Sequence, residues 1–370
     1  MRGAHLRPVV IAAGGTGGHF FPAEALAEAL LARGQRVALM TDARSGGLAS
    51  RAFANGEQFV LAGAGVAGRG AARGAQAFAG MAFGAMQARR ILARLGPAAI
   101  VGFGGYPCVA PMLGAAMLRR RPALLLHEQN AVLGRANRLL ARRCDLLALS
   151  QSDTARVPAE TRTTVVGNPV RAAIAALAGI AYQPPVERME LLVLGGSLGA
   201  RVFSDIVPPA LALLPPDVRA RLHVVQQCRA EDLARVREAY ADSGIDAELA
   251  AFFPDVAILL GRAHLVVARA GASTVAELAI AGRPSILVPL PHAIDDHQSA
   301  NAQTLARAGA AWMVPQPRFD APALSARLAH LIQHPAILAT AASAASGQAR
   351  ADAANALADC TMQLVAERVA

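Results

Sequence analysis

The sequence predicts an α/β protein with two similar domains whose parallel sheets face each other across a cleft. Three observations support this fold class. The chain has 370 residues, which is long for a single hydrophobic core. Short apolar runs alternate with helical patterns along most of its length, as βαβ units require. Two glycine-rich turns of nearly the same design, residues 14–19 and 195–200, each follow an apolar run and precede a helical pattern.

Seven apolar runs in the first half are expected to form strands. They lie at Val9–Ala13, Val37–Met40, Gln58–Leu61, Ala98–Gly102, Ala123–Leu126, Leu146–Ala148 and Thr164–Val166. The first run leads into Gly14-Gly15-Thr16-Gly17-Gly18-His19, a tight turn at the start of a helix. Unpaired N–H groups at a helix start attract phosphate. The alternative is that the glycines only allow the chain to make a tight turn from strand to helix. Phe20 stands where a dinucleotide motif has its last glycine, which disfavours a dinucleotide site.

The second half repeats the alternation. Its expected strands are Leu191–Leu194, Leu222–Val225, Ala247–Ala251, Leu265–Ala268, Ser285–Val288 and Ala311–Met313. A linker near residues 167–186 separates the halves, so we expect an N-terminal domain at 1–167 and a C-terminal domain at 168–344. The alanine-rich helix at about residues 345–370 could pack against either domain, and in one arrangement it packs back against the N-terminal domain.

Composition excludes several classes of protein. Hydrophobic residues make up 54% and charged residues 17%, which excludes disorder. The net charge is +10 and all 36 basic residues are arginine, so lysine chemistry is excluded and an anionic partner is expected. That partner is nucleic acid, a phosphorylated substrate or an anionic membrane. The four scattered cysteines have no zinc-type spacing.

An uncharged stretch of 24 residues, Leu95–Leu118, is long enough to span a bilayer. It contains prolines and the glycine cluster at residues 102–105, and we interpret it as strand, loop and helix. The chain is therefore expected to be soluble or peripheral to a membrane.

The segment Arg269–Leu278 follows the expected strand Leu265–Ala268 and opens a helix. Ser273 or Thr274 can cap this helix while its free amides bind pyrophosphate, and the Glu277 carboxylate suits two adjacent ribose hydroxyls. The alternative is a capping box, in which Ser273 or Thr274 caps the helix with Glu277 as its partner.

A polar segment, residues 289–301, follows the next expected strand and suggests a sugar-binding loop. The alternative is a metal site in which His292 and His297 act with Asp295 or Asp296. The chain has no Asp-x-Asp pattern for a divalent ion. We therefore expect no metal or other cofactor, and helix N-termini with Arg171 would stabilise a diphosphate.

In the first half, residues 102–106 and 127–130 both follow expected strands and should reach the same edge of the sheet. His127 and Glu128 could contribute chemistry there or serve only as loop hydrogen-bonding groups.

Seven motifs occur in one order along the chain: GGTGGH, GFGGY, HEQN, GNPVR, GGS-x-GA, RAGAST-VAE and DDHQ-x-AN. In order and spacing they resemble the MurG family of peripheral membrane transferases over nearly the whole chain. The resemblance implies a GT-B fold of two Rossmann-like domains. It also implies transfer of N-acetylglucosamine from UDP-GlcNAc to the undecaprenyl-linked muramyl-pentapeptide of peptidoglycan synthesis. Leu198 departs from the family, which usually has glutamine there, and we expect one altered contact near the diphosphate.

The resemblance also implies site residues by motif position. Thr16, Gly17 and Gly18 would face the donor diphosphate or the acceptor pyrophosphate. Asn130 would contact the donor sugar, whose hydroxyls Gln298 would bind, and Phe253 would frame the uracil through its backbone. The diphosphate would meet Arg171 and Ser197, and the phosphates and ribose would meet Ala272, Ser273, Thr274, Val275, Ala276 and Glu277.

The implied reaction is a single displacement with inversion at the anomeric carbon, and it needs a base for the acceptor hydroxyl. We expect His19 to be that base, because it opens a helix beside the glycine turn and imidazole suits proton transfer near neutral pH. The alternative is that His19 only orients phosphate. Glu128 is the rival base.

Residues 69–94 and their surroundings combine apolar side chains with arginines, as in a helix at an anionic bilayer surface. The residues concerned are Phe78, Met81, Phe83, Met86 and Ile91, with Arg69, Arg73, Arg89, Arg90, Arg94, Arg119, Arg120, Arg121, Arg135, Arg138, Arg142 and Arg143. The alternative is an ordinary amphipathic helix packed on its own sheet. The resemblance implies a peripheral protein on the cytoplasmic face of the bacterial inner membrane, with other cell-wall synthesis proteins as further candidates for partners. Nucleic acid is disfavoured, since no aromatic platform accompanies the arginines.

The residues alone do not exclude three other functions. The first is transfer of a UDP-sugar to another acceptor such as diacylglycerol, and the second is epimerisation of a UDP-sugar. A non-catalytic UDP-sugar sensor is the third, and it would need no base.

Overall fold

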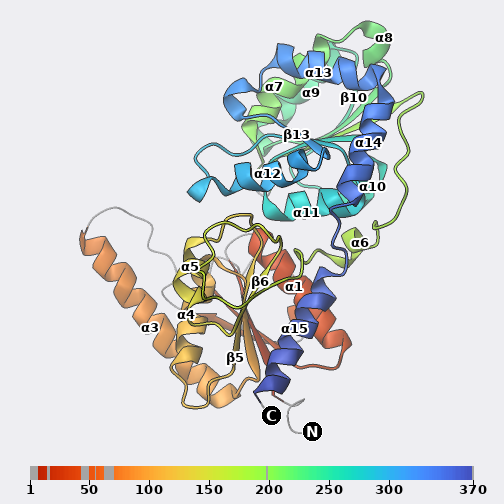
Figure 1. Ribbon diagram of the computed structural model, residues 1–370. Coiled ribbons are helices and arrows are strands. Elements are labelled where there is room, and N and C mark those ends of the chain that lie inside the picture. The colour runs from red at the N-terminus through yellow and green to blue at the C-terminus, as the bar shows by residue number, and fades with distance from the viewer. Residues whose placement is uncertain are drawn as a thin grey trace. The chain divides into compact units, whose positions relative to one another are not determined.

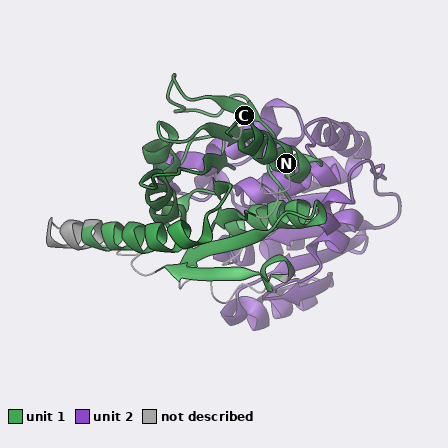
Figure 2. Ribbon diagram, turned by 90° about the horizontal axis from the view of Figure 1, so that it is seen from below, with its two compact units in different colours: residues 1–171, 351–370 green, residues 172–350 purple. Residues whose placement is uncertain are grey.

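The computed structural model describes residues 7–14, 17–42, 50–54, 56–61, 71–196 and 199–368, without the side chains of residues 51 and 71–78. The chain divides into two compact units (Figure 2). Unit 1 consists of residues 1–171 and 351–370, and unit 2 of residues 172–350.

Unit 1 is built on a seven-stranded parallel sheet with the order β3-β2-β1-β4-β5-β6-β7. The order runs outward in both directions from β1, as in a doubly wound sheet. The strands are β1 (Val9–Ala12), β2 (Val37–Asp42), β3 (Glu57–Leu61), β4 (Ala99–Gly102), β5 (Ala123–Glu128), β6 (Leu146–Leu149) and β7 (Thr163–Val165).

Helices cover both faces of this sheet. In Figure 1, α3 lies beside α4 and α1 lies beside α15. A Cβ on Gly114 of α4 would come within 2.8 Å of the Ala85 carbonyl oxygen, so only glycine permits this approach of α3 and α4. The helices of unit 1 are α1 (Gly17–Ala32), α2 (Arg51–Ala54), α3 (Ala71–Leu95), α4 (Gly105–Ala116), α5 (Arg135–Ala141) and α15 (Ala353–Glu367).

Unit 2 repeats the plan with a six-stranded parallel sheet of order β10-β9-β8-β11-β12-β13. Its strands are β8 (Met189–Leu194), β9 (Leu222–Gln227), β10 (Asp246–Ala250), β11 (Leu265–Ala268), β12 (Ser285–Leu287) and β13 (Ala311–Met313). Its α-helices are α6 (Ala172–Ala175), α7 (Arg201–Ala212), α8 (Pro216–Arg219), α9 (Leu233–Asp242), α10 (Val256–Arg262), α11 (Ala272–Ala281), α12 (His297–Arg307), α13 (Ala321–Gln333) and α14 (Pro335–Ser346). Short 3₁₀ turns are η2 (Ala230–Asp232), η3 (Ile294–Asp296) and η4 (Gln316–Arg318).

The central strands are buried on both faces. Val9 and Ile11 of β1 belong to one core cluster of unit 1, whereas Val10 and Ala12 belong to the cluster on the opposite face. This burial explains why the strands read as continuous apolar runs rather than as alternating patterns.

The thirteen strands expected from the sequence are all present; β11 and β13 have the expected bounds, and the ends of the others are shifted by one or two residues. One shift affects the site. β5 continues to Glu128, so His127 and Glu128 are buried strand residues and do not follow the strand as expected.

The stretch Leu95–Leu118 forms β4, a glycine loop and α4, as predicted. Within the described ranges, no helix combines the length and apolar character needed to cross a bilayer.

Candidate active site

The two glycine-rich turns lie at equivalent places in the two sheets. The turns follow β1 in unit 1 and β8 in unit 2, the strands from which each sheet is wound in both directions. The direction of winding reverses between β1 and β4 in unit 1, and between β8 and β11 in unit 2. Ligands of open α/β sheets bind at the carboxyl ends of the strands at this point. Ligand-binding residues are therefore expected in the segments after β1, β4 and β5 in unit 1, and after β8 and β11 in unit 2.

His19 lies in the first turn of α1 and is half-buried. Its Nδ1 is 3.0 Å from Oε1 of Gln129, which follows β5. Gly105, at the start of α4, has a φ of +68°, and a Cβ there would lie 3.3 Å from Cδ2 and 3.4 Å from Nε2 of His19. The loops after β1, β4 and β5 thus meet around one imidazole.

A chain of hydrogen bonds continues from Gln129 into the sheet. The Gln129 Nε2 lies 2.9 Å from His127 Nδ1, and His127 Nε2 lies 2.9 Å from the Gly167 carbonyl oxygen. His127 is fully buried beside the Phe103 ring, and this burial lowers its pKa to about 4. His127 is therefore a neutral imidazole at physiological pH.

Glu128 organises the loop that follows it. Its Oε1 accepts from the backbone and side-chain nitrogens of Asn130 at 3.0 and 2.9 Å, and its Oε2 accepts from Gly134 N at 2.8 Å and Asn137 Nδ2 at 2.9 Å. The side chain is buried. A buried carboxylate that accepts four N–H groups is better suited to holding this loop in place, as a structural brace, than to accepting a proton from a substrate.

The other predicted residues of unit 1 lie close to these loops. Gly17 and Gly18 open α1, and Asn130 is half-buried on the Glu128 carboxylate. Arg171 lies with its guanidinium 5.0 Å from the centre of the Phe21 ring, one turn along α1 from the glycines. Thr16 lies outside the described residues.

In unit 2 the turn after β8 is tightly folded. A Cβ on Gly195 would lie 2.3 Å from Ala200 N, so only glycine fits. Gln227, at the end of β9, accepts from Gly195 N at 3.1 Å and donates to Gly196 O at 3.1 Å. Ser197 and Leu198 lie outside the described residues, so the predicted contact of Ser197 has no structural description.

The predicted cap of the helix after β11 by Ser273 or Thr274 is wrong, and so is the capping-box alternative. Gly271 is its N-cap, and Ser273 and Thr274 lie inside the first turn rather than at the cap. No described side chain caps the helix, and Ser273 Oγ has no hydrogen-bond partner among the described residues. The first-turn amides therefore have no capping oxygen. The remaining members of the predicted set, Ala272, Val275, Ala276 and Glu277, lie in the first two turns.

Side chains of α12 hold the adjoining loops. The buried Asn301 donates to Ala270 O at 3.1 Å, and Gln298 Oε1 accepts from Leu290 N at 2.9 Å. Arg269 donates to the carbonyl oxygens of Val288 and Pro289, both at 3.1 Å. The loops after β11 and β12 are thus joined into one rim, to which Gln298 belongs.

The metal alternative for this rim is not supported. Among the described residues, which include His292, Asp295, Asp296 and His297, no three His, Cys, Asp or Glu side chains lie close enough to hold a metal ion. The His297 Nδ1 is instead 2.7 Å from the Ile294 carbonyl oxygen.

Phe253 is buried in the segment between β10 and α10. Its side chain therefore packs inside unit 2, which leaves the backbone as the part that could meet a ligand.

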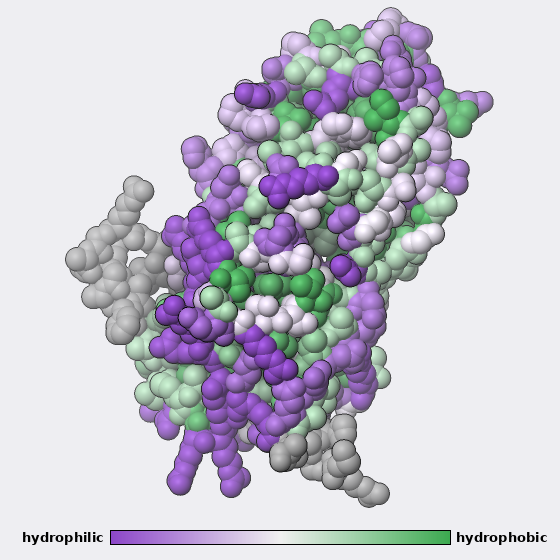
Figure 3. Space-filling model, in the orientation of Figure 1, coloured by the Kyte–Doolittle hydropathy of each residue, from purple (hydrophilic) through white to green (hydrophobic). Residues whose placement is uncertain are grey.

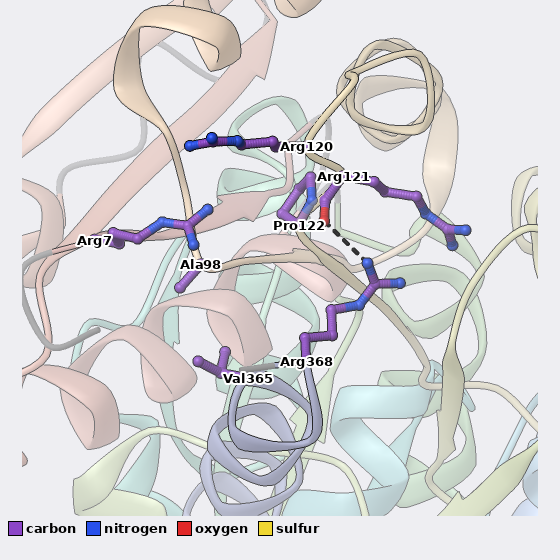
Figure 4. A pocket seen from close by; sticks show the side chains of 7 residues that line it. All are labelled: Arg7, Ala98, Arg120, Arg121, Pro122, Val365 and Arg368. Atoms are coloured by element: carbon purple, nitrogen blue, oxygen red, sulfur yellow. Dashed lines mark hydrogen bonds between the residues drawn. The ribbon is translucent and has the colours of Figure 1, made fainter. Parts of the chain in front are cut away.

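A pocket lies at the opposite edge of the unit 1 sheet, near the amino ends of β1, β4 and β5 (Figure 4). It is lined by Arg7, Ala98, Arg120, Arg121, Pro122, Val365 and Arg368. Arg7 donates to the carbonyl oxygens of Gly96 and Pro97, and Arg368 donates to that of Arg121 and to Asp145. No predicted site residue lines this pocket.

Four polar residues were assigned no role from the sequence although they position the site. Gln129 and Asn137 hold the unit 1 loops, and Gln227 and Asn301 hold the unit 2 loops. Each is a buried amide at or just beyond the end of a strand, or on a helix beside one. A buried amide in an otherwise apolar setting is the signal that could have identified them.

Comparison with known proteins agrees with this geometry. Residues 9–148 match the glycosyltransferase family 28 N-terminal domain, and residues 190–357 match the glycosyltransferase family 28 C-terminal domain. Two doubly wound units of this kind form the GT-B fold, which confirms the predicted fold class.

Similar proteins cover nearly the whole chain. A UDP-N-acetylglucosamine–N-acetylmuramyl-(pentapeptide) pyrophosphoryl-undecaprenol N-acetylglucosamine transferase of Granulibacter bethesdensis is 60% identical over 359 residues, which are 96% of this chain and 94% of the relative. The protein of the same name from Acidiphilium cryptum is 54% identical over 369 residues, 100% of both chains. The crystal structure of Acinetobacter baumannii MurG has a TM-score of 0.76 at 29% identity, covering 96% of this chain and 99% of that one. The chain therefore belongs to glycosyltransferase family 28 and, within it, to the MurG transferases.

Proposed function

We propose that this protein transfers N-acetylglucosamine from UDP-GlcNAc to the muramyl sugar of an undecaprenyl-pyrophosphoryl-MurNAc-pentapeptide acceptor, with inversion at the anomeric carbon. The observation that carries the proposal is the 54% identity over 100% of both chains to a relative whose name states this transfer. The contacts around His19 in unit 1 and the uncapped start of α11 in unit 2 support the proposal.

The donor is assigned to unit 2. The uncapped start of α11 presents backbone amides where a diphosphate would lie, and such amides bind anions without a metal ion. Glu277, half-buried in the second turn of α11, is proposed to bind the ribose hydroxyls. Gln298 uses its Oε1 for Leu290 N, which leaves its amide hydrogens for the sugar hydroxyls.

The acceptor is assigned to unit 1, with His19 as the base. The muramyl hydroxyl oxygen attacks the anomeric carbon as the bond from that carbon to the UDP oxygen breaks, and the hydroxyl proton passes to His19. UDP leaves with the electron pair of the broken bond, and Arg171 is proposed to stabilise its charge. Glu128 is not proposed as the base, because its carboxylate accepts four N–H groups within the protein.

A membrane surface is proposed as the source of the lipid acceptor. Phe83 and Met86 of α3 are exposed, and the exposed Arg89, Arg90 and Arg94 lie further along the same helix. Figure 3 shows hydrophilic residues over much of the visible face of unit 1, in the lower half of the view. Met81 and Ile91 pack against the core instead, so only part of the predicted apolar set is available to a bilayer. Arg69 lies outside the described residues, and the side chains of Arg73 and Phe78 are not described.

The decisive experiment measures UDP release from UDP-GlcNAc with and without the lipid acceptor. We expect release only with the acceptor, together with a product that contains a β-linked N-acetylglucosamine. Equal release with diacylglycerol would favour another acceptor, and a UDP-linked epimer would identify an epimerase. UDP-GlcNAc binding without any turnover on the lipid acceptor would identify a sensor and overturn the proposal.

A further inference from the structure

We infer that Gln129 and His127 are positioning residues that hold the proton of neutral His19 on Nδ1 and leave its Nε2 as an unprotonated acceptor. The inference rests on the proposed function, in which His19 is the base. It concerns two residues that do not themselves meet the substrate, since Gln129 is 2% exposed and His127 is fully buried.

The direction of the hydrogen-bond chain is set by two carbonyl oxygens, which can only accept. The Gly167 oxygen lies 2.9 Å from His127 Nε2, so this nitrogen carries the hydrogen and His127 Nδ1 is left as an acceptor. The His127 carbonyl oxygen lies 3.3 Å from Gln129 Nε2, which orients the amide of Gln129 with its nitrogen towards His127. Both constraints agree with the 2.9 Å contact between Gln129 Nε2 and His127 Nδ1.

The orientation of the amide then decides the state of His19. With its nitrogen towards His127, Gln129 presents Oε1 to His19 Nδ1 at 3.0 Å. An amide oxygen can only accept, so His19 Nδ1 is the donor and the neutral ring has its lone pair on Nε2. The reverse chain would place lone pairs of His127 Nε2 and the Gly167 oxygen against each other in a buried site, which is costly.

Nε2 lies on the edge of the His19 ring that does not contact Gln129. Gly105 lies beside Cδ2 and Nε2, where a Cβ would come within 3.3 to 3.4 Å of the ring. When Nε2 takes the proton of the acceptor hydroxyl, His19 becomes an imidazolium whose Nδ1–H still donates to Gln129. No member of the chain has to rotate or exchange a proton during the step, so the site needs little reorganisation.

The first test reads the tautomers directly in the wild-type protein. Nitrogen-15 NMR of histidine-labelled protein, with signals assigned by His19→Gln and His127→Gln, distinguishes a protonated from a bare ring nitrogen. We expect His127 to carry its hydrogen on Nε2 and neutral His19 to carry its hydrogen on Nδ1. A His19 ring protonated on Nε2 would overturn the inference, whatever the activity of the enzyme.

The second test removes the link with Gln129→Met, which keeps the length of the side chain. We expect kcat to fall about 10-fold or more, as for lost outer partners of functional histidines, with the KM for UDP-GlcNAc nearly unchanged. The His19 signals should then show a mixture of tautomers. Gln35→Met is the matched control, because Gln35 is a 3% exposed glutamine of the same unit that donates to the Arg7 carbonyl oxygen.

The outcomes separate this inference from the proposed function. If Gln129→Met matches Gln35→Met in kcat and leaves the His19 tautomer unchanged, the positioning role is wrong although the transferase can stand. If His19→Ala keeps wild-type kcat, the assignment of the base itself fails.

Discussion

Asn137, in the first turn of α5, donates a 2.9 Å hydrogen bond to Oε2 of Glu128, the last residue of β5. The same amide nitrogen donates to the His127 carbonyl oxygen at 3.1 Å. The strand end and the following helix are thereby joined across the loop that contains Gln129 and Asn130. The acidic residue of the HEQN motif is thus part of the loop's support.

Replacing Asn137 with alanine is expected to lower stability by about 1–3 kcal/mol, because it removes a buried donor from the Glu128 carboxylate. If Glu128 is a brace, Asn137→Ala and Glu128→Gln should reduce thermal stability and kcat together. If Glu128 were the base, Glu128→Gln would abolish turnover while Asn137→Ala kept most of it. Thermal unfolding and steady-state kinetics of the two variants distinguish these results.

Replacing His19 with alanine is expected to lower kcat at least about 10²-fold, the low end for loss of a general base. UDP-GlcNAc binding, measured by calorimetry, should be nearly unchanged, because the donor is assigned to unit 2. His330→Ala is a suitable control, since His330 is an exposed histidine of α13. Near-normal turnover by His19→Ala would contradict the assignment.

Replacing Glu277 with alanine is expected mainly to raise the KM for UDP-GlcNAc, because the variant loses the proposed contact to the ribose. The effect of one lost charge-assisted hydrogen bond is about 1.5–3 kcal/mol, or roughly 10-fold or more in affinity. Glu231→Ala, an exposed carboxylate of the same unit, is the control. Donor titration curves that coincide for the two variants would exclude a ribose contact.

The buried His127 is expected to make the protein less stable in acid. Burial lowers its pKa from 6.5 to about 4, so between these pH values the unfolded chain binds a proton that the folded chain does not. The neutral His127 therefore makes its full contribution to the free energy of unfolding above pH 6.5. As the pH falls towards 4, the free energy of unfolding decreases by roughly 3 kcal/mol. Urea unfolding from pH 7 to pH 4.5 should show a weaker pH dependence for His127→Gln than for wild type. The control His330→Gln should follow wild type.

Replacing Phe83 and Met86 with serine is expected to weaken flotation with anionic vesicles by at least about 10-fold, since their insertion would bury apolar surface. Both side chains are exposed, so stability should be unaffected. Arg89→Gln and Arg90→Gln should each weaken binding about 5-fold at low salt, and the difference should shrink as salt is added. Leu213→Ser, an exposed apolar position of unit 2, is the control. Vesicle binding that ignores all of these changes would place the membrane contact elsewhere.

Much of the fold could be predicted because parallel strands buried on both faces give unbroken apolar runs. β11 and β13 have the predicted bounds, and the other strands differ only at their ends. The end of β5 was missed because His127 and Glu128 are polar, and polar residues usually mark the end of a buried strand. The burial of Glu128 is compensated by hydrogen bonds from Asn130, Gly134 and Asn137 in the following loop and helix, and that of His127 by the Gly167 carbonyl oxygen, 40 residues along the chain. The sequence pattern of the strand does not show either set of partners.

The location of the candidate site along the chain could be predicted, but the roles of several of its residues could not. Glycine turns and helix starts are local patterns, so the helix starts that contain His19 and Ser273 could be located from the sequence. The start of α11 was less certain, because Gly271 and Ser273 are both acceptable caps and only the backbone angles decide between them. The roles of Gln129 and Gln227 depend on which loops meet, and that is a property of the assembled sheet.

The last helix, α15, affects the order in which the two units can fold during synthesis on the ribosome. Leu357, Ala358 and Leu364 of α15 belong to the core of unit 1, although more than 170 residues of unit 2 are synthesised between them and the rest of that core. Domains usually complete their folding in the order of synthesis. Here unit 2 can complete its core first, and unit 1 has to wait for α15 to emerge from the ribosome.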